Sequence, residues 1–216
     1  MAGCCDPRGC QELFGPRFAR HLASRYRRRG LDATAARIVG IVTRHGVDGA
    51  TVLEVGGGVG DRQLELLRLG AVHATNLELV DAYEPEAARL AAAAGLGERI
   101  TRRVVDIAVD PASVAAADVV VLNRVVCCYP DYERLLAAAA DHARRLLVFS
   151  HPPRTPVTRA LVSATNAGFR LRGRSFRNYT HSPAAMVAVA EARGLHASYD
   201  EGGRIWRVVG LTRAAR

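Results

Sequence analysis

Short apolar runs alternate along the chain with longer stretches in which apolar residues recur every three or four positions. The short runs, such as Asp-Val-Val-Val-Leu at 118–122, are typical of parallel strands buried on both faces. The longer stretches have the period of amphipathic helices. We therefore predict strands over 51–55, 72–77, 102–105, 118–122 and 145–150, and helices over 61–70, 84–94 and 132–143.

The residues before the first predicted strand show the helical period twice. In 11–29, apolar residues alternate with arginines, and Gly30 ends the segment. These apolar residues are Leu13, Phe14, Phe18, Leu22 and Tyr26. A second helix covers 34–44, with Asp32 as its N-cap. We therefore treat 1–46 as an N-terminal helical segment.

The chain changes character after residue 150. The segment 151–183 holds four prolines and many arginines, and we assign no helix or strand to it. A helix over 186–193 follows, and then strands over 195–199 and 204–211, which the Glu-Gly-Gly turn joins as a hairpin. The chain thus predicts an α/β fold, a three-layer αβα sandwich whose seven-stranded sheet is mostly parallel, with an antiparallel last strand.

Three alternate glycines follow the first predicted strand in the segment Thr-Val-Leu-Glu-Val-Gly-Gly-Gly-Val-Gly. Glycine lets the backbone turn sharply and approach a ligand closely, and a helix then opens off the loop. The dinucleotide fingerprint G-x-G-x-x-G fails here, because its third glycine would fall at Asp61 or Gln63. This failure disfavours a nicotinamide-dependent oxidoreductase.

The pattern E-x-G-x-G-x-G, formed by Glu54, Gly56, Gly58 and Gly60, resembles the first motif of the class I S-adenosylmethionine-dependent methyltransferases. The resemblance covers about residues 47–150. It implies a Rossmann-like fold and S-adenosylmethionine as cofactor, bound by these four residues. An acid beside this loop is acceptable because the ligand carries an ammonium and a sulfonium instead of phosphates.

An acid ends the second predicted strand at about the distance from the glycine loop where α/β nucleotide folds place a ribose-binding carboxylate. This acid is Glu78, whose two oxygens can accept from both ribose hydroxyls. Asp81 competes for the role but lies three residues further on, in the following loop.

The resemblance implies further site residues at strand ends. Asp106 would accept from the adenine amino group, and the backbone N–H of Ile107 would serve a ring nitrogen. Asn123 and Arg124 follow the fourth strand and should face the cofactor or the substrate. The family often covers its pocket with N-terminal helices and with an insertion after the fifth strand, which implies a lid at 1–46 and a substrate-covering insertion at 151–185 of the 47–216 domain.

The segment Asn-Arg-Val-Val-Cys-Cys-Tyr-Pro after the fourth strand, with the N-terminal aromatic and arginine pattern, resembles the magnesium-protoporphyrin O-methyltransferase group. Cys128 stands where that group would have histidine. Methyl transfer from a sulfonium needs alignment and a base only if the acceptor must lose a proton, so a carboxylate acceptor needs none. The candidate catalytic residues are Tyr129, His151, Tyr179 and His181.

Composition and charge limit the number of domains and the classes of ligand that the chain can have. With 216 residues, 49% of them hydrophobic, the chain suits one domain. Its net charge of +9 is uneven: 1–46 has nine arginines against three acids, 47–150 ten against fifteen, and 151–216 eleven against three. Basic flanks of this kind suit an anionic substrate or nucleic acid.

The sequence indicates neither a membrane span nor a signal peptide, since long apolar runs are missing and residues 1–11 have no apolar core. We therefore expect a cytoplasmic protein. Its cysteines, Cys4, Cys5, Cys10, Cys127 and Cys128, lack the spacing of a zinc site, and no metal is predicted.

The sequence therefore predicts an S-adenosylmethionine-dependent methyltransferase acting on a small, carboxylate-bearing metabolite. Arg174, Arg177 and Tyr179 would recognise the anion together with the N-terminal helix. The alternative is an RNA-binding or RNA-modifying protein of the same fold. The Asn/Asp-Pro-Pro-Tyr signature of base-amino methyltransferases is missing after the fourth strand, which disfavours that chemistry. The sequence leaves open the acceptor, O-, N- or C-methylation, and the oligomeric state.

Overall fold

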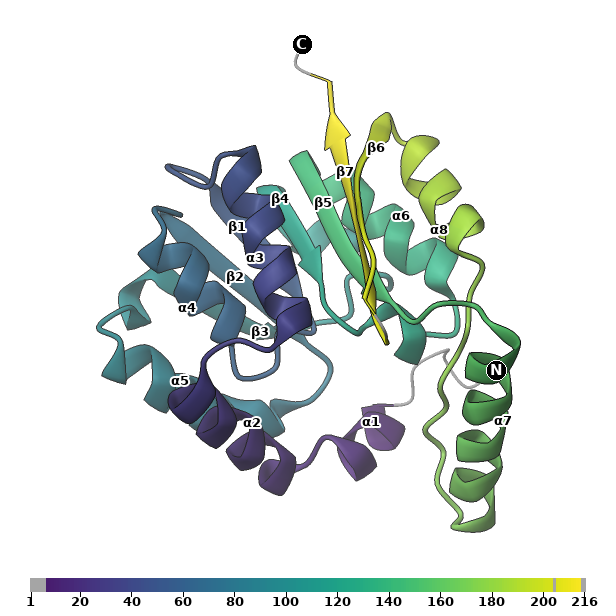
Figure 1. Ribbon diagram of the computed structural model, residues 1–216. Helices are drawn as coiled ribbons and strands as arrows, with labels where there is room; N and C mark the ends of the chain where they lie inside the picture. Colours follow the sequence, from purple (N-terminus) through teal and green to yellow (C-terminus); the bar gives the residue numbers. More distant parts are fainter. Residues whose placement is uncertain (1–6, 204, 215–216) are drawn as a thin grey trace.

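The computed structural model describes residues 7–203 and 205–214 and shows one mixed sheet between two helical layers (Figure 1). The strands are β1 (Thr51–Val55), β2 (His73–Glu78), β3 (Ile100–Val104), β4 (Ala117–Leu122), β5 (Ala143–His151), β6 (Leu195–Glu201) and β7 (Arg207–Arg213). Their order is β3-β2-β1-β4-β5-β7-β6, and β7 runs antiparallel to both of its neighbours. This confirms the predicted three-layer fold and its seven-stranded sheet.

The strand order reverses between β1 and β4, which are parallel neighbours. From β1 the chain winds outward through β2 to β3, and from β4 it winds the other way to β5. At such a switch point the loops after the two strands diverge and leave a crevice at their carboxyl ends. The glycine loop after β1 and the segment after β4 therefore border one crevice.

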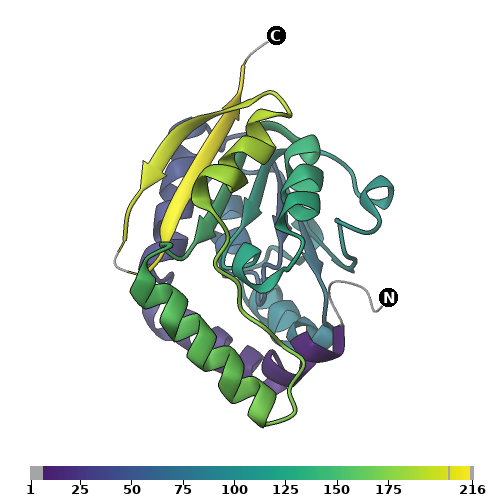
Figure 2. The same cartoon turned by 90° about the vertical axis from the view of Figure 1, so that its right-hand side faces the viewer.

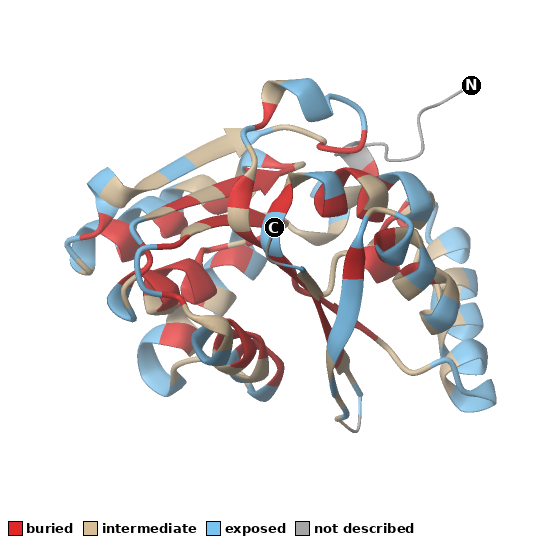
Figure 3. Ribbon diagram, turned by 90° about the horizontal axis from the view of Figure 1, so that it is seen from above, coloured by how far each residue is buried: buried red, intermediate tan, exposed pale blue. Residues whose placement is uncertain are grey.

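Helices cover both faces of the sheet. The α-helices of the described residues are α1 (Pro7–Leu13), α2 (Pro16–Arg29), α3 (Ala33–His45), α4 (Asp61–Arg68), α5 (Glu84–Ala93), α6 (Tyr132–His142), α7 (Pro156–Leu171), which lies apart from the sheet, and α8 (Pro183–Glu191). Alternate residues of β4 enter two separate cores: Val119 and Val121 pack with α2 to α5, and Val120 and Leu122 pack with α6 and α8. Burial on both faces explains the continuous apolar strand. The central strands β1, β4 and β5 are mostly buried, and buried strands run through the middle of Figure 3, whereas β3 and β6 at the sheet edges are partly or largely exposed.

The N-terminal prediction of one helix over 11–29 was wrong in detail. Two helices, α1 and α2, meet at Gly15 and Pro16. Proline has no backbone N–H and its ring obstructs a preceding helical turn, so Pro16 takes the first position of α2 instead. The predicted N-cap of α3 is confirmed, because Asp32 accepts from the backbone N–H groups of Thr34 and Ala35, each at 3.0 Å.

The segment 151–183 contains a helix that was not predicted. Its prolines lie at the start of α7 or outside it, and Pro156 occupies a first-turn position where a missing N–H costs nothing. The Thr155 hydroxyl caps the helix by accepting from the Thr158 N–H at 3.1 Å. None of residues 156–171, all of them described, is buried. The helix stands away from the sheet (Figure 2).

Candidate active site

A cavity of about 210 Å³ lies at the carboxyl ends of β1, β2, β3 and β4. The loops after these strands form its floor. On the other side it is bounded by Phe14, Phe18, Leu22 and Arg25, from the N-terminal helices and the turn between them. These helices thus border the cavity, while the boundaries at residues 46 and 185 remain predictions.

Two glycines of the loop after β1, Gly57 and Gly58, are required for different reasons. A Cβ on Gly57 would stand 2.7 Å from Glu54 Oε2, and the Gly57 N–H donates to Asn76 Oδ1 at 3.0 Å. Gly58 has a φ of +60°, and a Cβ there would have only the Tyr83 ring nearby, at 3.7 Å. Gly58 lines the cavity, so its missing side chain leaves ligand space. Gly56 lines the cavity as well.

Glu54 lies beneath the loop, and neither it nor Gly60 belongs to the described lining of the cavity. Its carboxylate is paired with Arg62, which also contacts Asp61 at 3.0 Å and donates to the Gly57 carbonyl at 3.1 Å. Burial raises the pKa of Glu54 although Arg62 opposes the shift. Glu54 therefore reaches the loop through Arg62, and its predicted direct contact with a cofactor stays a prediction.

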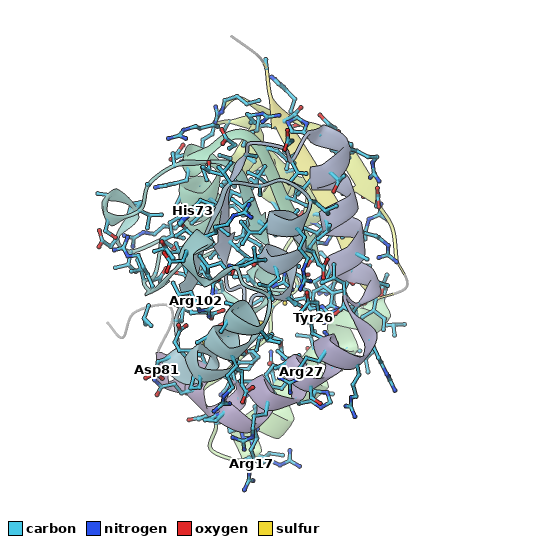
Figure 4. The ribbon with its side chains drawn as sticks, turned by 90° about the vertical axis from the view of Figure 1, so that its left-hand side faces the viewer. Arg17, Tyr26, Arg27, His73, Asp81 and Arg102 are labelled. Atoms are coloured by element: carbon cyan, nitrogen blue, oxygen red, sulfur yellow. The ribbon has the colours of Figure 1, made fainter. Side chains whose placement is uncertain are left out.

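Glu78 ends β2, lines the cavity and is only 6% exposed. Its Oε1 accepts from the Gly58 N–H. Burial raises the pKa of Glu78 to about 7, although the Gly58 N–H and the Arg102 guanidinium favour the ionised form. Arg102 itself is held by Glu84 at 2.9 Å. The competing acid, Asp81, is exposed and lies at the outer edge of the molecule in Figure 4.

Asp106 and Ile107 follow β3 and both line the cavity. Asp106 Oδ1 accepts from the Ala108 N–H at 3.0 Å, and its Oδ2 accepts from the Tyr129 hydroxyl at 2.9 Å. Tyr129, predicted as catalytic, thus lies in the cavity beside the acid predicted for adenine.

The other three predicted catalytic residues do not belong to the described lining of this cavity. His151 is 2% exposed and its Nδ1 donates to the Pro152 carbonyl at 2.9 Å; it lines a separate hollow between β6, β7 and α8. The Tyr179 and His181 rings stack at 5.6 Å, and His181 Nε2 donates to the Tyr129 carbonyl at 2.9 Å. Burial lowers the pKa of both histidines.

Asn123 and Arg124 follow β4 and line the cavity as predicted from the topology. Ser150 links them, since its hydroxyl donates to Asn123 Oδ1 at 2.9 Å and accepts from the Arg124 N–H at 2.8 Å. Arg124 has a φ of +61°, and no other described non-glycine residue has a positive φ. Its guanidinium lies 3.0 Å from Asp32. Sequence reasoning missed Asp32 and Arg25 as lining residues, because nothing marked them among the caps and arginines around them.

The arginines predicted to recognise an anion point elsewhere. Arg177 donates to the carbonyls of Arg174 and Phe176, at 2.6 and 2.7 Å, and neither arginine belongs to the described lining of the cavity. The aromatic Phe176 packs edge-on against Phe14 at 5.4 Å. This segment therefore supports the cavity wall through an aromatic contact.

Two cysteines, Cys10 and Cys128, line the cavity, and Cys127 Sγ lies 3.6 Å from Cys128 Sγ. Cys4 and Cys5 lie outside the described residues. Across 7–203 and 205–214 no three histidine, cysteine or acidic side chains gather closely enough to hold a metal ion. Within the same residues, no helix has the length and apolar character to cross a membrane.

Comparisons with known proteins place the fold. No family model and no curated protein matches the sequence. Magnesium protoporphyrin IX methyltransferase from Synechocystis PCC 6803, solved with bound S-adenosylhomocysteine, superposes with a TM-score of 0.71 at 19% identity over 94% of this chain and 100% of that one.

Two further solved structures are similar. An O-methyltransferase family protein from Burkholderia thailandensis gives a TM-score of 0.72 at 20% identity over 95% of this chain, which spans 63% of that longer one. A putative RNA methyltransferase from Pyrococcus horikoshii gives a TM-score of 0.59 at 11% identity, over 84% of this chain and 84% of that one. The chain therefore has the fold of the class I S-adenosylmethionine-dependent methyltransferases.

Proposed function

We propose that the protein is an S-adenosylmethionine-dependent methyltransferase with a small-molecule acceptor. One observation carries the proposal: Glu78, the Gly56–Gly58 backbone and Asp106 meet in a single cavity at the switch point of the sheet. These groups come from three different strand ends, yet together they offer acceptors for hydroxyl and amino groups and close backbone approach.

The residues present fit this cofactor. Glu78 would accept from the ribose hydroxyls, Asp106 from the adenine amino group, and the Ile107 N–H would serve a ring nitrogen. When bound, the cofactor supplies a methyl group made electrophilic by its sulfonium. Gly58 leaves room for the ligand, because a side chain there would enter the cavity.

The chain's own contribution to such a reaction is alignment and exclusion of water. Phe14, Phe18 and Leu22 form an apolar boundary of the cavity, which disfavours water beside the reacting atoms. The floor, held by the Glu54–Arg62 pair and the Ser150 contacts, fixes the positions of the loops. Such preorganisation is what an in-line displacement needs from a protein.

We further propose that the acceptor bears a carboxylate. Of the four predicted bases, Tyr129 alone belongs to the described lining, and its hydroxyl is engaged with Asp106. A carboxylate attacks without losing a proton, so it needs no base. The arginine excess of the flanking segments 1–46 and 151–216 also favours an anion.

The direct test is calorimetric titration of S-adenosylhomocysteine into wild type and Glu78→Ala. The variant should lose the bonds to both hydroxyls, about 2–4 kcal/mol at charged-acceptor values, and hence bind at least about tenfold more weakly. Asp81→Ala removes the exposed acid of the neighbouring turn and should bind like wild type. Failure of the wild type to bind S-adenosylhomocysteine or S-adenosylmethionine would reject the proposal.

An RNA acceptor is the second candidate, favoured by the basic flanks. Phosphate binding would show log K falling steeply with log salt, whereas a small acceptor requires no such binding. Filter binding of a mixed RNA pool from low to physiological salt separates the two. Tight, salt-sensitive binding would favour RNA; its absence at physiological salt favours the small molecule.

A further inference from the structure

Three charged side chains meet at the end of the cavity formed by β4 and the N-terminal helices. Arg25 comes from α2, Asp32 caps α3, and Arg124 follows β4; all three line the cavity. Asp32 Oδ2 lies 3.3 Å from the Arg25 guanidinium and 3.0 Å from that of Arg124. Residues far apart in sequence thus form one group, called here the Arg25–Asp32–Arg124 cluster.

The Arg25–Asp32–Arg124 cluster carries more positive than negative charge. Two guanidinium groups face one carboxylate, which leaves one net positive charge, and Asp32 Oδ1 is already used by two backbone N–H groups. The Nε atoms of Arg25 and Arg124 are both buried without a hydrogen-bond partner. A buried donor left unpaired costs free energy, so an anion that accepts from these groups would be favoured.

The backbone at Arg124 is strained to hold its side chain there. A φ of +61° is costly for a residue with a branched or bulky side chain, whereas glycine would adopt it freely. The Ser150 hydroxyl fixes this conformation by accepting from the Arg124 N–H, and the Trp206 ring lies 5.2 Å from the guanidinium carbon. Residues in such conformations cluster at ligand-binding and active sites, which agrees with the place of Arg124 in the cavity lining.

Charge changes in order along the cavity. At one end, Glu78 and Asp106 offer acceptors. Beneath the glycine loop, Glu54 and Asp61 outweigh Arg62 by one negative charge. At the other end, the Arg25–Asp32–Arg124 cluster is positive. S-adenosylmethionine has the complementary order: a neutral adenosine rich in donors, a cationic sulfonium and ammonium, and a terminal carboxylate.

We propose that Arg25 and Arg124 bind the carboxylate at the amino-acid end of the cofactor. The inference rests on the proposed function. The guanidinium groups approach this carboxylate from two elements, α2 and the segment after β4, so binding ties the N-terminal helices to the sheet.

The experiment compares S-adenosylmethionine with decarboxylated S-adenosylmethionine, which differs by the carboxylate alone. Calorimetry on the wild type should show at least about a tenfold preference for the carboxylated ligand. Arg124→Gln and Arg25→Gln should each reduce that preference to within about threefold. Arg28→Ala, an exposed arginine one turn beyond Arg25 on the same helix, is the matched control and should keep it.

The outcomes separate this inference from the function itself. Wild type that binds neither ligand contradicts the proposed function. Equal binding of both ligands by wild type, or an undiminished preference in both glutamine variants, overturns the inference and leaves the proposed function standing. A variant that weakens both ligands equally, with unchanged thermal unfolding, also counts against a carboxylate contact.

Discussion

The floor of the cavity and the arm formed by residues 152–182 are built in opposite ways. In the floor, Glu54, Glu78 and Asn123 are 1%, 6% and 8% exposed, and each is held by a hydrogen bond. In the arm, Leu161 and Leu171 of α7 are 63% and 88% exposed. The buried, hydrogen-bonded side chains of the floor are therefore held in one arrangement. The exposed side chains of the arm have few neighbours that fix their conformation.

The arm is attached chiefly through its returning segment. Phe176, 5% exposed, packs against Phe14 and lies 5.8 Å from Phe169. Tyr179 donates its N–H to the Cys127 carbonyl at 2.7 Å. The floor is held by buried polar groups, whereas the arm is held by a few aromatic contacts and hydrogen bonds. The two therefore differ in local stability, and the arm should open at lower free energy.

The largest effect should come from Gly58→Val in the floor. A β-branched residue resists a φ of +60°, and its side chain would occupy the cavity. S-adenosylhomocysteine affinity should fall more than about 100-fold, roughly 3 kcal/mol. Calorimetry measures this, and circular dichroism should show an unchanged fold. Gly97→Val, where a Cβ meets nothing within 4 Å, is the control. Normal cofactor binding by Gly58→Val would show that the floor tolerates substitution as the exposed positions of the arm do.

Next in size is the pH dependence of unfolding. Because burial raises the pKa of Glu78 from 4.5 to about 7, the folded protein keeps a proton that the unfolded chain releases in this window. Stability therefore falls as pH rises from 4.5 to 7, by up to about 3 kcal/mol, and the neutral Glu78→Gln variant lacks this loss.

Urea unfolding of both proteins across that window measures the effect. The advantage of the glutamine variant should grow with pH and level off above pH 7. In the arm, residues 152–180 contain no aspartate, glutamate or histidine, and His181 is present in both proteins, so its contribution to the slope cancels in the comparison. Parallel stability curves for the two proteins would contradict a buried, shifted Glu78.

A smaller effect is expected for Phe176→Ala in the arm. Truncating this buried ring should cost about 2–3 kcal/mol, below the usual core value, because its aromatic neighbours can partly close the gap. Urea unfolding gives the cost, and hydrogen exchange should rise in the arm before it rises in the sheet. Leu171→Ala, at an exposed position, serves as control. Exchange that rises uniformly would mean that the arm and the floor unfold as one unit.

The smallest effect should come from Leu161→Gln on the outer face of α7. The side chain is 63% exposed, so stability should change by less than about 0.5 kcal/mol and cofactor affinity by nothing measurable. Thermal unfolding and calorimetry check both. A loss of about 1 kcal/mol or more would show that this face is packed in solution and would weaken the contrast with the floor.

The elements that sequence reasoning found are those with strong local signals. The strands were predictable because two-sided burial makes them continuously apolar, as at Val119–Leu122. Glu78 was predictable as a lining residue because its position follows from strand and loop spacing. The helix α7 was missed because prolines surround its start, although its apolar residues recur with a helical period and none of them is buried.

The contacts between distant residues could not be predicted in the same way. Asp32 was identified as a cap, yet its pairing with Arg124 depends on how α3 packs against the sheet. His151 follows a strand and looked accessible, but β7 pairs beside it and buries it. One sequence gives residue types, whereas partners across elements arise only from the folded arrangement.

The place of β7 in the sheet bears on how the protein can fold during synthesis. This strand lies between β5 and β6, although it follows both in the chain. Until the ribosome has released it, β5 keeps an unpaired edge and β6 has no partner in the sheet. Exposed strand edges are prone to pair with other chains. The nascent protein therefore avoids aggregation only if β7 emerges and pairs before the free edges of β5 and β6 pair with another chain.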